Sequence, residues 1–126
     1  MNENQISRIV LLSAIEVHRT LGGPGLLESV YEEALAWELR ERGLSVERQK
    51  SVPISYKGRA LATPLRLDML VNGLVIVECK ATADYARIFE AQTLTYLRLM
   101  NLKLGLVINF GERLVKDGFH RVVNGL

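Results

Sequence analysis

Two short apolar runs that each carry an acidic residue constrain this chain more than any other feature. The run at residues 74–77 leads directly into Glu78-Cys79-Lys80, and Asp68 lies ten residues before Glu78 in the apolar run 65–71. Burying a charge is costly unless it is paired or bound to a metal. Because side chains alternate along a strand, Glu78 and Lys80 share a face. Two acids and a lysine that converge on one face could hold a divalent cation and activate a water.

The turn between the two runs decides whether the acids meet. A two-residue turn at Asn72-Gly73 pairs Asp68 with Val77 and puts Glu78 on the opposite face. A three-residue loop, or a bulge at Gly73, instead pairs Asp68 with Glu78 side by side. A shared site requires the second register.

Apolar spacing predicts the order α-α-β-β-β-α-β-β. The expected helices cover 4–21, 27–42 and 84–100, and the expected strands cover 46–56, 65–71, 74–80, 104–110 and 114–123. Apolar residues on both faces of 74–77 indicate a central strand. Pro53 indicates that the first strand is an edge or carries a bulge. We therefore expect an α/β fold, a central mixed sheet flanked by helices, in one domain over residues 1–126.

The charge is small overall but unevenly distributed. The net charge of +2 does not by itself imply a nucleic-acid partner, yet residues 40–66 hold seven bases and two acids. This basic segment leads into Asp68 and could follow a polyanion backbone. A basic solvated surface explains the same counts equally well.

Cysteine and hydropathy patterns indicate the compartment. Cys79 is the only cysteine, so no internal disulfide can form, and we expect a small core residue in a reducing environment. No stretch is long and apolar enough to span a bilayer. The sequence therefore predicts a cytoplasmic protein with no membrane partner.

Polar residues on two predicted helices are further candidates. Glu28 and Tyr31 are three residues apart, and Gln92 and Tyr96 are four apart, so each pair shares a helix face. Taken alone, Tyr31 is better explained as a core residue and Glu28 as a solvated acid. Gln92 follows the acidic strand, where its amide could reach a metal-bound water or a phosphate. His18 and His120 have no metal-ligand partner nearby and are expected to be structural or surface residues.

The strand residues suit a magnesium site. Magnesium prefers oxygen ligands and usually takes one or two carboxylates, with waters and phosphate oxygens completing the shell. Asp68 and Glu78 supply carboxylates, and the Cys79 backbone carbonyl is a further candidate ligand. Lys80 could stabilise charge on phosphorus or orient the attacking water. The competing interpretation is a buried structural pair, Asp–Lys or Glu–Lys. A purely structural role for these charges requires a Glu78–Lys80 contact that leaves no space for an ion.

Taken together, these features resemble the PD-(D/E)xK nuclease superfamily and, within it, the small bacterial family named for its GxxExxY motif. That motif is Gly25-Leu26-Leu27-Glu28-Ser29-Val30-Tyr31. Five other stretches also resemble the family, in the same order: 52–58, 66–71, 75–81, Ala91-Gln92 with Tyr96-Leu97, and 104–111. Leu67 stands where the superfamily has its proline.

The resemblance implies a restriction-endonuclease-like core and a magnesium- or manganese-dependent nuclease, with DNA as the expected substrate. It casts Asp68 and Glu78 as metal-binding acids, Glu28 as a further metal-binding acid from a helix, and Lys80 as the catalytic lysine. It also matches Gln92 and Tyr96 to a glutamine–tyrosine signature in which the glutamine lies near the metal.

A second function fits the same sequence. A non-catalytic module could bind nucleic acid or a partner protein on an inherited nuclease scaffold. Because the chain is small and shows no appended recognition domain, we expect it to act as a homo-oligomer or with a partner protein.

Overall fold

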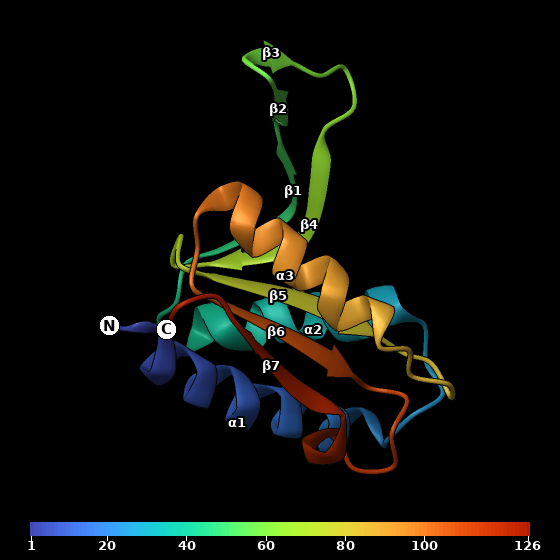
Figure 1. Cartoon of the computed structure of the whole chain (residues 1–126). Helices are drawn as coiled ribbons and strands as arrows, with labels where there is room; N and C mark the ends of the chain where they lie inside the picture. The colour runs from blue at the N-terminus through green and yellow to red at the C-terminus, as the bar shows by residue number, and fades with distance from the viewer.

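A computed structural model describes all residues, 1–126, and shows a five-stranded mixed sheet between helices (Figure 1). The helices are α1 (Glu3–Leu21), α2 (Glu28–Glu41) and α3 (Ile88–Met100). The sheet has the order β1-β4-β5-β6-β7, formed by Val46–Val52, Leu65–Val71, Val75–Lys80, Leu104–Asn109 and Phe119–Val123. Strands β5 and β6 are parallel and all other neighbours are antiparallel. The predicted α/β fold is confirmed.

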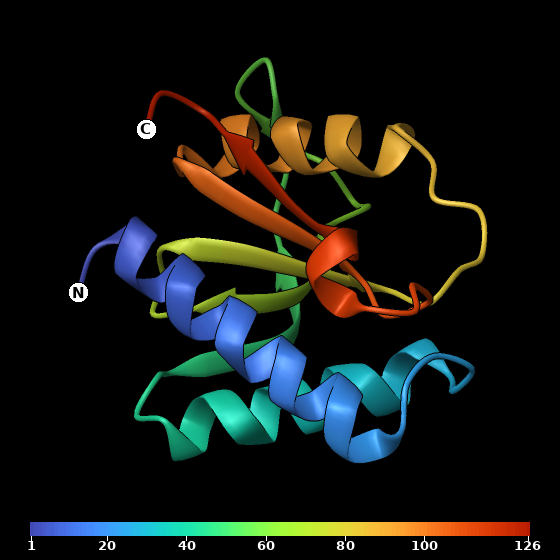
Figure 2. The same cartoon turned by 90° about the horizontal axis from the view of Figure 1, so that it is seen from below.

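Each face of the sheet carries its own hydrophobic core. Helices α1 and α2 cover one face and α3 covers the other (Figure 2). Val75 and Val77 pack on the α1–α2 side, whereas Ile76 packs on the α3 side, and all three are fully buried. Strand β5 is therefore the central strand that the sequence predicts. No helix is both long and apolar enough to cross a bilayer.

The first predicted strand is too long. Strand β1 ends at Val52, because Pro53 has no N–H to donate to a ladder, so the expected single strand to residue 56 is wrong. Ser55 and Tyr56 are extended but belong to a second sheet. The prediction that Pro53 marks an edge strand is confirmed. Beyond it, β2 (Ser55–Tyr56) and β3 (Arg59–Ala60) pair around Lys57-Gly58. Residues 53–64, here called the hairpin arm, project away from the sheet (Figure 1).

Two other boundaries differ from the expected ones by more than one residue. Helix α3 begins at Ile88 and not at residue 84. Thr82 and Asp84 exchange side-chain and backbone hydrogen bonds, a local turn that competes with helix formation. The last expected strand, 114–123, is wrong over its first half, because Val115–Gly118 form the 3-10 turn η1 and β7 starts at Phe119.

The register between β4 and β5 is the one that a shared site needs. Met69 pairs with Val77, and Val71 pairs with Val75, so the connecting loop is three residues long. Asn72 and Gly73 both adopt left-handed backbone conformations in that loop, at φ 51° and 66°. The three-residue register is confirmed, and it sets Asp68 opposite Glu78.

Close packing of α3 on β6 gives a stability prediction. A Cβ added at Gly105 would lie 2.4 Å from Thr93 Cγ2. We expect Gly105→Ala to lower the free energy of unfolding by about 1–3 kcal/mol, measured by urea denaturation. Thr93→Ser removes that methyl group but keeps the hydroxyl bond to the Phe89 carbonyl. The double variant should therefore be more stable than Gly105→Ala alone, and no recovery would contradict this packing.

Candidate active site

The two acids lie where β4 and β5 separate. The ladder between these strands ends at Met69 and Val77. One residue further, the Glu78 carboxylate accepts a hydrogen bond from the Asp68 backbone N–H, with an N···Oε2 distance of 2.8 Å. The Asp68 carboxylate in turn accepts from the Cys79 backbone N–H at 2.9 Å. Reciprocal side-chain bonds thus replace the ladder and hold both carboxylates in the gap between the strands.

A distortion in β1 faces the same point. The pairs Arg48–Met69 and Lys50–Leu67 flank Gln49, which lies across from Asp68 but forms no regular pair. Gln49 has φ 48°, a left-handed conformation that is strained for a residue with a side chain. Residues two apart on a regular strand point to the same face of the sheet. Leu67 and Met69 instead pack into the cores on opposite faces, so β4 is twisted between them. The sheet is therefore locally broken around Asp68.

Glu32 of α2 stabilises the distorted segment. Its side chain is almost fully buried and accepts hydrogen bonds from Gln49 Nε2, the shorter at 2.8 Å. Arg48 also pairs with Glu32 at 3.0 Å. Neither Glu32 nor Gln49 is among the site residues expected from the sequence. The only sequence signal is that Glu32 lies one helical turn beyond Glu28 and so shares its face.

Both acids have a raised proton affinity. Burial raises the pKa of Glu78 to about 8, with the neighbouring Asp68 charge as the second cause. Burial also raises the pKa of Asp68, as does the charge of Glu32, although the Cys79 N–H acts in the opposite direction. Ionising both carboxylates in this gap is therefore unfavourable without a cation, an arrangement that favours a bound positive ion.

Lys80 lies nearby but does not neutralise the acids. Its ammonium sits 4.6 Å from the centre of the Phe89 ring and forms no ion pair with any carboxylate within 4.0 Å. The Glu78–Lys80 contact required by a purely structural pair is therefore absent, and that interpretation is wrong. The cation–π contact holds Lys80 near the acids while leaving its N–H donors free.

The two GxxExxY side chains have different environments. Glu28, the first residue of α2, is exposed, and partial desolvation followed by the Asp68 and Glu32 charges raises its pKa while Lys80 opposes the shift. Tyr31 is fully buried and stacks on Phe110 at 4.8 Å. Its hydroxyl donates to the Gly23 carbonyl at 2.7 Å and accepts from the Leu26 N–H. Tyr31 therefore fixes the loop that delivers Glu28.

Helix α3 contributes one residue of its predicted pair. Tyr96 is half-buried, and burial followed by the charges of Glu78 and Asp68 raises its pKa. Gln92 lies one turn earlier on the same face, is exposed, and makes no side-chain hydrogen bond. The geometry brings Tyr96 towards the acids and gives Gln92 no contact with them.

The oxygen donors fit a hard divalent cation. No group of three His, Cys, Asp or Glu side chains is close enough to hold a metal by itself. Two carboxylates are nevertheless enough for magnesium, which retains several waters in most protein sites. Neither of the two surface cavities contains Asp68 or Glu78. The candidate site is thus the strand gap and not an enclosed pocket.

The raised pKa of Glu78 predicts a pH-dependent stability in metal-free protein. The folded state keeps this proton to about pH 8, whereas the unfolded chain releases it near 4.5. Between pH 4.5 and about pH 8 the unfolded chain binds fewer protons than the folded protein. The stabilisation that the Glu78 proton provides is therefore complete below pH 4.5 and is lost as the pH rises to about 8. Glu78→Gln should remove this slope and be more stable than wild type above pH 8, by on the order of a few kcal/mol.

Urea denaturation in EDTA at a series of pH values measures this effect. Glu33→Gln is the matched control, since Glu33 is an exposed glutamate of α2 without an ion pair. A wild-type slope that persists in Glu78→Gln would contradict the assignment.

Comparison with known families agrees with this geometry. A family model described as the PD-(D/E)XK nuclease superfamily matches residues 4–122. Comparison with curated proteins and with solved structures gave no significant match. The match spans nearly the whole chain, including the acids, the lysine and all three helices. The chain belongs to the PD-(D/E)XK nuclease superfamily.

Proposed function

We propose that this protein is a divalent-metal-dependent nuclease that hydrolyses phosphodiester bonds, with DNA as its substrate. Within the superfamily, we assign residues 1–126 as one domain of the small bacterial GxxExxY family, acting in the cytoplasm. The observation that carries the proposal is the pair of carboxylates held in the strand gap. Asp68 and Glu78 are fixed by reciprocal backbone bonds, both have raised pKa values, and no cationic side chain pairs with either.

The roles of the side chains follow from their chemistry. Asp68 and Glu78, with the Cys79 carbonyl, would hold the cation, Mg²⁺ or Mn²⁺. When bound, such an ion polarises a phosphoryl oxygen and lowers the pKa of a coordinated water. Lys80 keeps its donors free above Phe89 and would stabilise charge developing on the phosphate oxygens. Glu28 would orient a water at the exposed edge of the gap.

Residues on α3 complete the proposed site. Tyr96 faces the acids and would contact a bound strand beside the scissile phosphate. Gln92, exposed one turn away, would reach the phosphate or a metal-bound water once the substrate is in place. Both roles extend the residue pattern in which the chain resembles the GxxExxY family.

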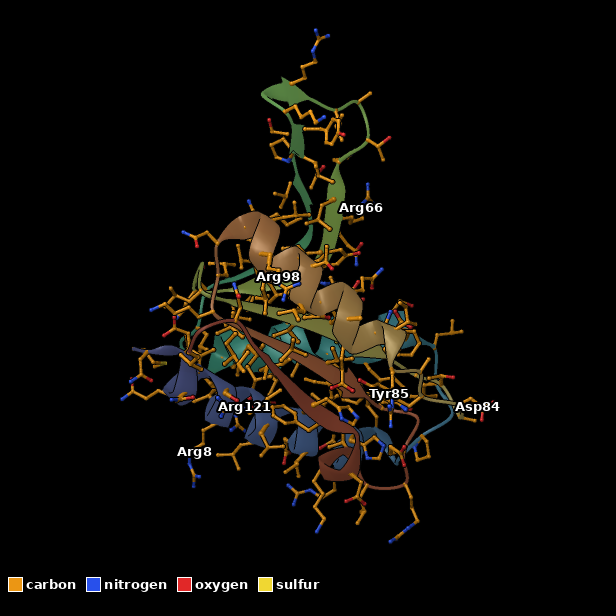
Figure 3. All side chains as sticks on the ribbon, viewed as in Figure 1. Arg8, Arg66, Asp84, Tyr85, Arg98 and Arg121 are labelled. Carbon is orange, nitrogen blue, oxygen red and sulfur yellow. The ribbon has the colours of Figure 1, made fainter.

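The basic segment supports a nucleic-acid substrate. Residues 48–67 contain five bases and no acid. Arg48 and Lys50 already pair with Glu32 and Glu47, whereas the bases on or beside the hairpin arm have no ion pair. These free bases are Lys57, Arg59 and Arg66, the last labelled in Figure 3. The arm continues the strands that carry Gln49 and Asp68, and a two-stranded ribbon fits the DNA major groove.

Substitution of the proposed catalytic residues tests the activity. We expect Lys80→Ala and Glu78→Ala to reduce cleavage of labelled DNA by at least about 100-fold, because each loses a group that stabilises the transition state or holds the metal. The control is Lys103→Ala, which should cleave normally. Lys103 is an exposed lysine directly before β6, at the opposite end of that strand from Asn109. Circular dichroism checks that each variant is folded.

The screen should include linear, nicked, branched and single-stranded DNA with Mg²⁺ and Mn²⁺. Wild-type protein that cuts none of these substrates would contradict the enzymatic proposal.

Calorimetric titration with Mn²⁺ separates the enzyme from a non-catalytic module on the same scaffold. The module has one observation in its favour, namely that no three metal-ligating side chains are preassembled. We expect wild-type protein to bind the ion and Asp68→Asn to lose at least about tenfold in affinity, because a charged ligand is removed. Absent binding in wild type favours the module, as would equal binding in Asp68→Asn.

A further inference from the structure

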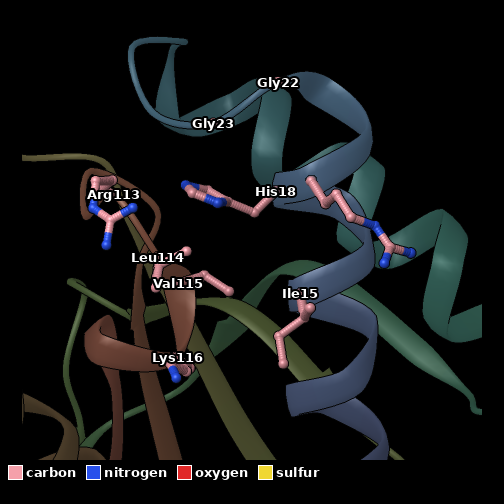
Figure 4. Close-up of a pocket in the computed structure, with 9 residues that line it drawn as sticks. Ile15, His18, Gly22, Gly23, Arg113, Leu114, Val115 and Lys116 are labelled. Carbon is pink, nitrogen blue, oxygen red and sulfur yellow. The ribbon is translucent and has the colours of Figure 1, made fainter.

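A cavity of about 400 Å³ opens between the C-terminal end of α1 and the turn η1 (Figure 4). Four of its lining residues carry a basic side chain and none carries an acid: His18, Arg19, Arg113 and Lys116. Ile15 and Val115 supply apolar wall. The volume matches a small organic ligand or one nucleotide unit, and the lining favours an anion. This cavity is called the basic pocket below.

Two of the cations in the basic pocket are free to bind a ligand. Arg113 and Lys116 are exposed and take part in no ion pair or side-chain hydrogen bond. Arg19, by contrast, pairs with Glu16 on its own helix. An anion that enters the pocket can therefore engage Arg113 and Lys116 without breaking an existing bond.

His18 offers a third contact from the opposite wall. Its side chain is only 5% exposed, and Nε2 lies 3.1 Å from the Phe110 carbonyl oxygen. The other ring nitrogen, Nδ1, has no hydrogen-bond partner and is not sealed from solvent. Figure 4 shows the imidazole directed into the pocket, towards the side that carries Arg113.

The basic pocket and the acids lie at the same end of the sheet. The Phe110 N–H donates to the Lys80 carbonyl at 2.7 Å, and the Phe110 carbonyl meets His18. Another wall residue, Gly23, accepts the Tyr31 hydroxyl that fixes the loop before Glu28. The pocket thus borders the carboxyl ends of the parallel strands β5 and β6, where α/β proteins commonly bind ligands.

We propose that the basic pocket binds a phosphate group of the substrate strand, separate from the phosphate at the acids. This inference rests on the proposed nuclease function and adds a second anchoring point for the strand. A phosphate presents several acceptor oxygens, which suits a guanidinium fork and an ammonium converging from different positions. Because His18 Nε2 donates to the Phe110 carbonyl, a contact from Nδ1 to the phosphate requires the protonated imidazolium form. Such an anchor would hold the strand in register while the scissile phosphate lies at Asp68 and Glu78.

The test measures oligonucleotide binding by fluorescence anisotropy in EDTA, where cleavage cannot occur. The pocket variant is Arg113→Gln with Lys116→Gln. The control, Arg8→Gln with Lys103→Gln, makes the same charge change at exposed bases outside the pocket (Arg8 in Figure 3). We expect the pocket variant to raise Kd about tenfold or more and to reduce the salt slope by about two, while the control changes Kd by less than about threefold. Equal losses in the two variants overturn the proposal.

A second measurement identifies the source of the phosphate. The His18 ring signals in NMR spectra should shift when inorganic phosphate is added, and an oligonucleotide should displace that phosphate. Shifts with phosphate or a mononucleotide that no oligonucleotide can displace would assign the pocket to a small phosphorylated ligand and overturn the proposal, as would no shift at all. Wild-type protein that never cleaves, but whose oligonucleotide binding is weakened by the pocket variant, would support this inference and contradict the nuclease proposal.

Discussion

The structure depends on one exchange of hydrogen bonds at the point where β4 and β5 part. The Glu78 carboxylate accepts a hydrogen bond from the Asp68 backbone N–H, and the Asp68 carboxylate accepts one from the Cys79 backbone N–H. These two bonds take the place of regular backbone bonds between the strands. This exchange satisfies buried backbone donors and, at the same time, forces two acids into one poorly solvated gap. Local strand geometry and site chemistry therefore come from the same two side chains, and burial of these carboxylates, with the Asp68 charge beside Glu78, creates the demand for a cation.

The neighbouring elements are arranged around that gap. Glu32 holds the strained Gln49 opposite Asp68, so β1 can bend where the sheet opens. On the other side, the stacked pair Tyr31 and Phe110 links the loop before Glu28 to the end of β6. Strain and polar burial gathered around one point are typical of functional sites, because a fold retains them only where the surrounding packing supports them.

The sequence predicts the fold well because its signals are local. Alternation and apolar runs identify the central strand, and Asn72-Gly73 restricts the β4–β5 register to two choices, of which the structure adopts the three-residue loop. The predicted ends of strands and helices are wrong where a local feature prevents the regular backbone hydrogen bonds, as at Pro53 after β1 and at the Thr82 turn before α3. Glu32 and Gln49 could not be predicted, because burial of the acid and the left-handed backbone arise only when α2 meets β1. The hairpin arm is likewise a tertiary feature.

The most direct measurement is an anomalous difference map from crystals grown with Mn²⁺. We predict one ion in the β4–β5 gap, bonded at about 2.1 Å to carboxylate oxygens of both Asp68 and Glu78, with Lys80 outside the coordination shell. A gap that stays empty at saturating Mn²⁺, or one filled by the Lys80 ammonium, would contradict it.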